Sequence, residues 1–501
     1  MFCAKESCSI LPLFVAVPLA GAFLSSLLGK TSSKISDFLG SLVPAILVLL
    51  SFSFIGLKEV LVYKMGGWIP PFGIVFVVDG LTVLMLVTVN VVALMSTIFS
   101  ISYMEKYTDK WKYYTLFLLM LTGMNGAVIT GDMFNLFVWL EIGAISSYAL
   151  VAFGTEGEEL EASFKYAVMS SVASLFILVG IGLLYSYTST LNMADISRTL
   201  VAKPNANLIN FVFILFLLGF GLKSAIVPFH SWLPDAHPSA PAPISAMLSG
   251  VLIKSLGIYA LVRIFYNVLG VAGGGRVLLV LGLISMVLGA LLAIYQKDLK
   301  RLLAYSTISQ VGYIVFAFGL GTPLGIFAGL FHLINHAVAK ALMFLNAGSV
   351  VYATDNVRDL DQLGGLREKM PVTANTSLIG SMSIAGVPPL GGFWSKLVII
   401  FAAVESKHWA GAFVAILVSI VTLAYYLKLQ KLVFFGKLPV RWENIKESPV
   451  LMCVSMIVLS CICIALGLLL LPQLRSVFLD PAVEVLKNGV GYSKAVFENI
   501  K

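Results

Sequence analysis

Charged residues are scarce in this chain. Only 12% of its 501 residues are Asp, Glu, Lys or Arg, whereas 59% are hydrophobic. A typical soluble domain has about 25% charged residues and about 45–50% apolar residues. One or two soluble cores would not hide so much apolar surface. The composition therefore excludes an ordinary water-soluble enzyme and predicts a polytopic membrane protein.

Cysteine is also scarce, and the five cysteines lack the spacing of a metal site. Cys3 and Cys8 lie near the N-terminus, and Cys453, Cys461 and Cys463 lie in one apolar run. Zinc and iron–sulfur sites usually draw on closely paired cysteines, so we interpret these five as small packing residues. Phosphate-binding loops and dinucleotide fingerprints are absent as well. We expect no metal and no cofactor in this chain.

The charged minority is basic, with 33 Lys and Arg against 25 Asp and Glu. The sequence has no basic block or arm of the kind that binds nucleic acid, so we expect no nucleic-acid partner. The excess fits instead the surplus of Lys and Arg that membrane proteins carry on their cytoplasmic loops.

Long apolar runs fill almost the whole sequence. A helix needs about 20 apolar residues to cross a bilayer core of about 30 Å. By this measure we predict about 14 transmembrane helices, near residues 10–28, 36–57, 78–101, 113–131, 133–153, 164–187, 207–229, 243–265, 276–296, 302–320, 325–351, 373–403, 410–434 and 449–472. The last residues, 473–501, mix apolar and charged side chains, which predicts a short surface helix.

An even number of spans places both termini on the same side of the membrane. With the loops assigned alternately, one side collects roughly 16 Lys and Arg and the other roughly 8, the C-terminal tail left out. The basic side should be cytoplasmic. We therefore expect a multi-pass protein of the plasma membrane with both termini outside.

Two of the predicted spans contain prolines that should break them. Span 7 carries Pro228 and runs into the polar segment HSWLPDAHPSAPAP at residues 230–243, and span 12 contains Pro388 and Pro389. Proline removes a backbone donor and clashes with the preceding turn. At membrane depth, broken backbone is tolerated only where it is buried in protein or lines a wet cavity.

The spacing of the two breaks suggests an internal repeat. Five spans separate them, as expected if spans 4–8 and 9–13 are related units. An odd number of spans in each unit would invert the second copy, a design found in many ion transporters. We therefore divide the chain into residues 1–112, a first repeat 113–265, an inverted second repeat 276–434, and residues 449–501.

Several ionisable residues lie in the middle of predicted spans, where a lone charge costs at least a few kcal/mol. Glu141 comes nine residues after Asp132, which places it on the order of 14 Å into span 5. Lys223 lies just before the break of span 7, Lys254 is central in span 8, and Lys396 follows the break of span 12.

Span 11 carries three ionisable residues on one helical stripe. His332, His336 and Lys340 are four residues apart, so their side chains line up along one face. Any one of the buried groups has a simpler interpretation, a structural ion pair for Lys or Glu and a packing role for His. Asp79, Asp132 and Arg263 lie close to span ends, and we expect them at the membrane interface.

Proton handling is the chemistry that these residue types permit together. Burial brings the proton affinities of lysine and glutamate toward neutrality, and a nearby opposite charge reverses that effect. A change in the separation of Glu141 and Lys223 would thus take up or release a proton. Histidines, which titrate near neutral pH, suit a relay between such groups.

Four segments resemble one known family. They are TGDMFNLFVWLE (130–141), LKSAIVPFHSWLPDAHPSAPAPISAMLSG (222–250), KRLLAYSTISQVGY (300–313) and HLINHAVAKALMFL (332–345). The chain is similar over nearly its whole length to the antiporter-like subunits shared by respiratory complex I, Mrp-type sodium/proton antiporters and membrane-bound hydrogenases. That resemblance implies fourteen helices with two inverted five-helix repeats. It also implies a proton path through residues Glu141, Lys223, Lys254, His332, His336 and Lys396, to which the stripe of span 11 adds Lys340.

Within that family, the chain looks most like the D-type Mrp subunit, because of its short length, the segment TGDMFNLFVW and the lysine at 396. The equivalent subunit of hydrogenase or sulfur-reductase complexes is similarly close. We therefore expect a proton-translocating subunit that works with other membrane subunits. The alternatives are an ion-pumping subunit of a redox-driven complex, whose redox centres lie on other chains, and a stand-alone solute carrier. Because Glu141 is the one clear carboxylate near the path, any sodium should pass through partner subunits.

Overall fold

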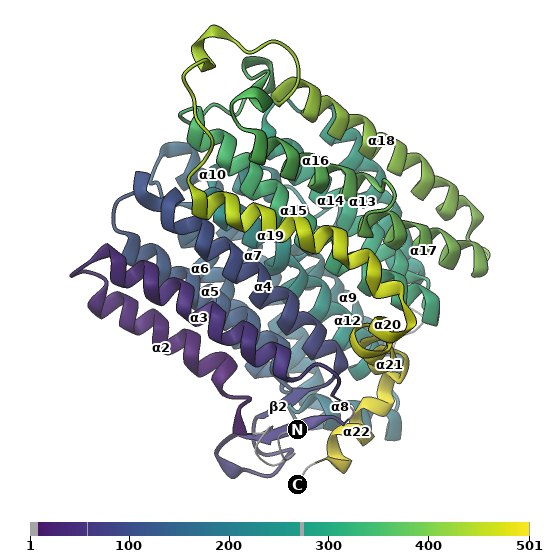
Figure 1. Cartoon of the computed structure of the whole chain (residues 1–501). Helices are drawn as coiled ribbons and strands as arrows, with labels where there is room; N and C mark the ends of the chain where they lie inside the picture. Colours follow the sequence, from purple (N-terminus) through teal and green to yellow (C-terminus); the bar gives the residue numbers. More distant parts are fainter. Residues whose placement is uncertain (1–8, 58, 271–274, 500–501) are drawn as a thin grey trace.

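The computed structural model describes residues 9–57, 59–270 and 275–499 and is almost entirely helical (Figure 1). Long helices lie side by side, and eleven of those described are long and apolar enough to cross a membrane. The expectation of a helical polytopic membrane protein is therefore confirmed, although the fold also contains one short β-hairpin.

The N-terminal part contains α2 (Leu13–Leu28), α3 (Ser33–Ser53) and α4 (Gly80–Tyr103). Two short antiparallel strands, β1 (Leu61–Lys64) and β2 (Val75–Val78), connect α3 to α4. The sequence did not predict this hairpin, because its strands are only four residues long.

The central part continues with α5 to α12. Their bounds are α5 (Lys110–Ile129), α6 (Met133–Val151), α7 (Gly157–Thr188), α8 (Met193–Ala202), α9 (Ala206–Lys223), α10 (Leu233–Ser239), α11 (Ala242–Met247) and α12 (Ala260–Val262). Two π-helical stretches, η3 (Leu248–Tyr259) and η4 (Arg263–Val268), flank α12. Residues 242–268 therefore form one continuous helical stretch that is wound more widely than an α-helix over most of its length.

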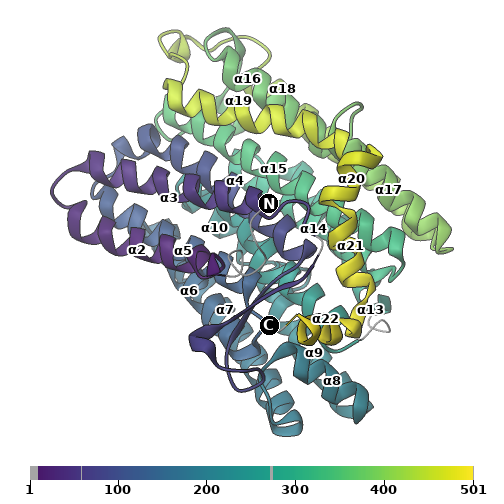
Figure 2. The same cartoon turned by 60° about the horizontal axis from the view of Figure 1, so that its bottom comes forward.

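The C-terminal part runs from α13 to α22. The bounds are α13 (Gly275–Tyr295), α14 (Leu299–Gly319), α15 (Pro323–Ala353), α16 (Pro371–Ala385), α17 (Gly391–Glu405), α18 (Trp409–Val433), α19 (Val450–Ala465), α20 (Pro472–Phe478), α21 (Asp480–Lys487) and α22 (Tyr492–Glu498). Figure 2 shows α20, α21 and α22 following one another across one end of the bundle. This segment contains three short helices where the sequence suggested one.

Several helices begin at a polar residue that caps their first turn. Asp79 accepts a hydrogen bond from the Thr82 amide at 3.0 Å and starts α4. Asp132 does the same for α6 with the Asn135 amide at 2.7 Å. Asp and Asn are preferred at this position because their side chains satisfy amides that have no partner within the helix.

The prolines singled out in the sequence lie between helices. Pro228 falls in the interval between α9 and α10, and Pro388 and Pro389 fall between α16 and α17. Gly386, directly after α16, has a positive φ of 87°, a conformation that favours glycine.

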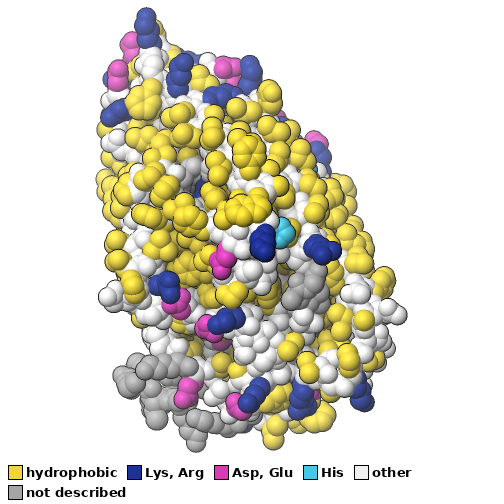
Figure 3. All heavy atoms as spheres, turned by 90° about the vertical axis from the view of Figure 1, so that its right-hand side faces the viewer, with side chains coloured by type: hydrophobic (Ala, Val, Ile, Leu, Met, Phe, Trp, Pro, Cys, Tyr) yellow, Lys and Arg dark blue, Asp and Glu magenta, His cyan; other side chains and the backbone are white. Residues whose placement is uncertain are grey.

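The helices differ sharply in how much of them is covered by protein. The apolar stretches of α15 and of residues 242–268 are 100% buried and that of α14 is 94% buried, whereas that of α19 is only 28% buried. Figure 3 shows a broad hydrophobic area on one face of the molecule, with charged side chains above and below it. The fully buried stretches carry Lys254, His332, His336 and Lys340, whereas α6 and α9, which carry Glu141 and Lys223, are about half buried. The outer helices present apolar surface suited to lipid or to other membrane proteins.

Candidate functional site

Glu141 and Lys223 form an ion pair between α6 and the end of α9. Their Oε1 and Nζ atoms are 3.5 Å apart, and their side chains are 27% and 5% exposed. Ser174 of α7 donates a hydrogen bond to the Glu141 carboxylate, and Lys223 donates one to the Ser170 hydroxyl at 3.2 Å. The expected partnership of Glu141 and Lys223 is therefore present in the structure.

The backbone next to this pair is irregular. Ala225, two residues after Lys223, has a positive φ of 54°, which is strained for a residue with a side chain. Trp232 holds the segment in place by donating to the Leu222 carbonyl at 3.0 Å and stacking on Tyr166 at 4.2 Å. A cavity of about 10 Å³ beside Lys223 is close to the size needed for one water molecule.

Lys254 lies fully buried in the π-helical stretch η3. Its ammonium donates to the carbonyl of Ser249 in the same stretch. Among the described residues, no carboxylate lies within ion-pair distance of it. π-Helical turns are often found at functional sites.

The three residues of the α15 stripe are buried and face the same interior region. His332 hydrogen-bonds through its two ring nitrogens to Ser395 at 2.9 Å and Gln310 at 3.2 Å. His336 stacks on His332, with 6.2 Å between ring centroids, and neither of its ring nitrogens has a hydrogen-bond partner in the described protein. Lys340 donates to the Leu303 carbonyl and to the Tyr426 hydroxyl, both at 3.0 Å.

Lys396 lies in α17, a few residues after the break between α16 and α17, as its sequence position predicted. Its ammonium approaches the Ala385 carbonyl at 3.4 Å and lies 4.8 Å from the centre of the Tyr313 ring. Tyr313 donates to the Ala415 carbonyl at 2.6 Å, so its ring is held in place by α18. The lysine is 3% exposed and, in the part of the chain described, has no carboxylate partner.

These residues form two groups. His336 interacts electrostatically with Lys254, Lys340, His332 and Lys396, so all five belong to one buried cluster. Among the described residues, Glu141 is the charged group that acts on Lys223. The structure thus gathers five of the seven predicted residues and leaves the Glu141–Lys223 pair beside them, where the cavity next to Lys223 is also lined by Leu252 and Leu256 of η3.

One buried histidine was not predicted from the sequence. His237 of α10 is fully buried against Phe344, and neither ring nitrogen has a partner among the described residues. It interacts electrostatically with Lys340, Lys300 and Lys254, which places it at the edge of the same cluster. The polar segment after Pro228 was the available signal, since a histidine in a proline-broken span is costly unless it is used.

Asp79 and Arg263, which lie near the ends of predicted spans, are buried within the protein and paired with each other. They form a two-pronged ion pair at 2.7 and 2.8 Å, with side chains 2% and 5% exposed. Asp132, also expected at the interface, is buried as the cap of α6. Sequence position near a span end does not reveal that the hairpin and the C-terminal helices cover this end of the bundle.

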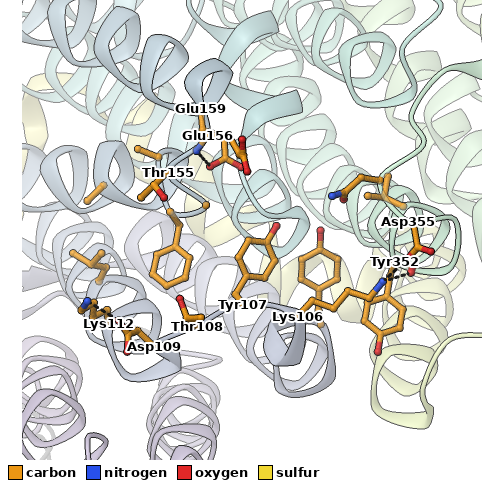
Figure 4. Close-up of a pocket in the computed structure, with 18 residues that line it drawn as sticks. Lys106, Tyr107, Thr108, Asp109, Lys112, Thr155, Glu156, Glu159, Tyr352 and Asp355 are labelled. Atoms are coloured by element: carbon orange, nitrogen blue, oxygen red, sulfur yellow. Dashed lines mark hydrogen bonds and ion pairs between the residues drawn. The ribbon is translucent and has the colours of Figure 1, made fainter.

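A cavity of about 710 Å³ opens at the end of the bundle where α4, α6 and α15 finish and α5 and α7 begin (Figure 4). Lys106 and Lys112 in its wall are paired with Asp355 and Asp109. The hydroxyl of Tyr107 points toward the side of the cavity that carries Glu156 and Glu159. Burial raises the pKa of Tyr107, and the Glu159 carboxylate adds to this effect. The hydrogen bond from Lys112 lowers the pKa of the exposed Asp109.

The described residues include no cluster of three or more His, Cys, Asp or Glu side chains able to hold a metal ion. The chemistry available is proton transfer between buried amines, imidazoles and hydroxyls.

Residues 130–422 match the family described as NADH:quinone oxidoreductase/Mrp antiporter, transmembrane part. Residues 68–114 match the N-terminal part of chain 5 of NADH–ubiquinone oxidoreductase, complex I. The N-type subunit of the NADH-quinone oxidoreductase of Desulforudis audaxviator is 35% identical over 439 residues, 85% of this chain and 87% of that one. The D-type subunit of the Na(+)/H(+) antiporter of Alkalihalophilus pseudofirmus is 36% identical over 378 residues, 75% of this chain and 76% of that one.

Two solved structures share the fold over nearly the whole chain. A chain of the Mrp complex from a Dietzia species superposes with a TM-score of 0.89 at 28% identity and covers 98% of this chain and 99% of that one. A chain of the membrane-bound sulfane sulfur reductase, an archaeal respiratory membrane complex, superposes with a TM-score of 0.87 at 30% identity, covering 98% and 100%.

Proposed function

Because the chain belongs to the NADH:quinone oxidoreductase/Mrp antiporter family, we propose that it is the proton-translocating subunit of a multisubunit, Mrp-type cation/proton antiporter module. One observation carries the proposal. Lys254, Lys340 and Lys396 are buried in the centre of the protein without a carboxylate partner among the described residues. Burying unpaired amines is expensive, and a membrane protein retains such groups for ion or proton movement.

The proton route follows the buried cluster. Protons pass between Lys254, the histidines His332 and His336, Lys340 and Lys396, along a hydrated axis at mid-membrane. Lys223 lies at one end of this route, and Glu141 controls its protonation. Separating the two charges changes the proton affinity of Lys223.

The finer architecture fits this route. We propose fourteen transmembrane spans, in which α9 with α10 and α16 with α17 are each one span broken near Pro228 and at Pro388–Pro389. Residues 113–265 and 276–434 form two inverted five-helix repeats, between residues 1–112 and 449–501. The two breaks then take equivalent places in the repeats, each beside one lysine of the path, Lys223 or Lys396.

The cavity of about 710 Å³ offers access from one end. Its wall carries Glu159, which interacts electrostatically with Lys300, and Lys300 also acts on His237 at the edge of the cluster. We propose this end as the cytoplasmic one and the cavity as the mouth of a half-channel. The protein then lies in the plasma membrane with its termini outside.

Partner subunits complete the function. Glu141 is 27% exposed at mid-helix, and an exposed carboxylate facing lipid is costly. We propose that a neighbouring membrane subunit covers it and transmits its own charge state to the pair. Any sodium path runs through partner subunits, because the described cluster offers nitrogen donors and few of the oxygen ligands that sodium requires.

A redox-driven complex is the second candidate, because the chain is similar both to an oxidoreductase subunit and to a chain of a sulfur reductase. Purification of the native complex separates the two functions. Only small membrane subunits, together with sodium-driven proton movement in proteoliposomes, support the antiporter. Iron–sulfur or nickel proteins in the purified complex would support the redox-driven function, with the same proton path in this subunit.

The proposal that sodium does not pass through this chain can be tested separately. Carbodiimide reacts with a protonated carboxyl group in an apolar site, so it should label Glu141 at the same rate with and without sodium. Protection by sodium, but not by choline, would contradict the assignment of sodium to partner subunits.

A further inference from the structure

The buried pair Asp79–Arg263 lies apart from the cluster, and its arginine is on the same helical stretch as Lys254. Arg263 follows Lys254 by nine residues, a separation of at most about 14 Å along the helix axis. Its guanidinium also donates to the Thr82 hydroxyl at 3.1 Å and the Asn267 side chain at 3.3 Å. The stretch between the two residues is mostly π-helical, with a single α-turn, α12, just before Arg263.

A surface cavity of about 520 Å³ reaches this pair from the end of the protein that holds the hairpin and α20–α22. Asp79 forms part of its wall, together with Glu59, Glu484, Tyr492 and Ala495. Of the three carboxylates on the wall, Asp79 is paired with Arg263 and Glu484 with Lys487. Glu59 has no ion-pair partner among the described residues, so the wall keeps an excess negative charge that favours cations.

The C-terminal segment forms the cover between the pair and the solvent. The ring centre of Tyr492, at the start of α22, lies 5.3 Å from the guanidinium carbon of Arg263. Asn267, one helical turn beyond Arg263, donates to the carbonyls of Val485 and Gly489 at 2.8 and 2.9 Å. The same short stretch therefore holds the ion pair and the segment that covers it.

We propose that Asp79, Arg263 and Tyr492 form a gate through which protons pass between Lys254 and this cavity. When the pair opens, the Lys254 ammonium gives a proton through bridging waters to the Asp79 carboxylate and becomes a neutral amine. The Asp79 carboxyl then passes the proton to water in the cavity and pairs with Arg263 again. Arg263 keeps its charge throughout. The inference rests on the proposed function, since it supplies the second opening of the same route.

A charge removal tests the gate. Asp79→Asn keeps the helix cap of α4, because asparagine caps as well as aspartate, but it cannot carry the proton. We expect the complex to assemble and its proton transport in proteoliposomes to fall at least about tenfold, equivalent to about 1.4 kcal/mol on the barrier. Native transport by assembled Asp79→Asn would overturn the proposal.

A matched pair of cysteine variants tests the cavity without altering the gate. Ala495→Cys places a thiol in the cavity wall, and Lys494→Cys places one on the adjacent residue of α22, whose side chain is 79% exposed and lies outside the lining. Native complex and both variants are treated in detergent with a cationic methanethiosulfonate reagent, checked by mass spectrometry, and reconstituted.

We expect the reagent to reduce transport at least about tenfold only in Ala495→Cys, and a reducing agent to restore it. Equal rates in the two labelled variants, or failure of the reagent to reach Ala495→Cys, would overturn the gate. If the untreated native complex moves no protons, the proposed function fails instead.

Discussion

Replacing Glu141 by glutamine tests the ion pair that we place at the start of the proton route. The Nζ and Oε1 atoms of the pair are 3.5 Å apart. At an effective dielectric constant between about 20 and 40, their attraction is about 2 to 5 kcal/mol. The lower value suits the partly exposed side of Glu141, and the higher value suits the buried ammonium of Lys223.

Moving Glu141 away from Lys223 removes at most this attraction, so the attraction sets the largest change in the proton affinity of Lys223 that movement of the pair can produce. One tenfold change in a protonation equilibrium corresponds to 1.36 kcal/mol, so even the lower value is about thirtyfold. Glutamine keeps the shape of the side chain and a hydrogen bond from Ser174, but it removes the charge. We therefore expect Glu141→Gln, and likewise Lys223→Ala, to reduce transport at least about thirtyfold while the complex still assembles.

The assay is proton uptake by proteoliposomes that contain the native complex, followed with a pH-sensitive dye. Glu161→Gln serves as the matched control, because Glu161 pairs with Lys165 at 2.7 Å on the surface and is 68% exposed. Such exposed pairs contribute little, so this variant should transport normally. An assembled Glu141→Gln complex that transports at the native rate would refute the coupling of the pair to proton movement.

Two further variants probe the cluster and the break beside it. Lys254→Met should abolish transport yet leave the thermal unfolding temperature of the complex unchanged or raised. The reason is that it removes a buried amine that has no carboxylate partner among the described residues. A loss of stability without loss of transport would favour a purely structural lysine. Gly386→Ala should lower both stability, by about 1–2 kcal/mol, and transport, because the residue has a φ of 87° and its new Cβ would lie 3.2 Å from Cδ of Lys396. Its control is Gly182→Ala, where a Cβ would meet nothing within 4 Å, and equal behaviour of the two variants would contradict the strain argument.

The sequence by itself determined the class of the protein and singled out the ionisable residues that we propose for the proton route. Apolar runs long enough to span a bilayer require membrane helices, because helices satisfy their own backbone hydrogen bonds. Ionisable residues such as Lys254 and Lys396 stood out against that apolar background, and prolines such as Pro388 marked the breaks by local chemistry alone. All of these signals are local, so no knowledge of the packing was needed to find them.

Only the tertiary structure decided which of these groups meet. Asp79 and Arg263 are 184 positions apart in the chain, and their pairing depends on how α4 packs against residues 242–268. The gathering of Lys254 with the α15 histidines, the burial of His237 and the π-helical winding around Lys254 depend equally on neighbouring helices. The energy of a buried charge is set by the groups that surround it, and those groups come from distant parts of the chain.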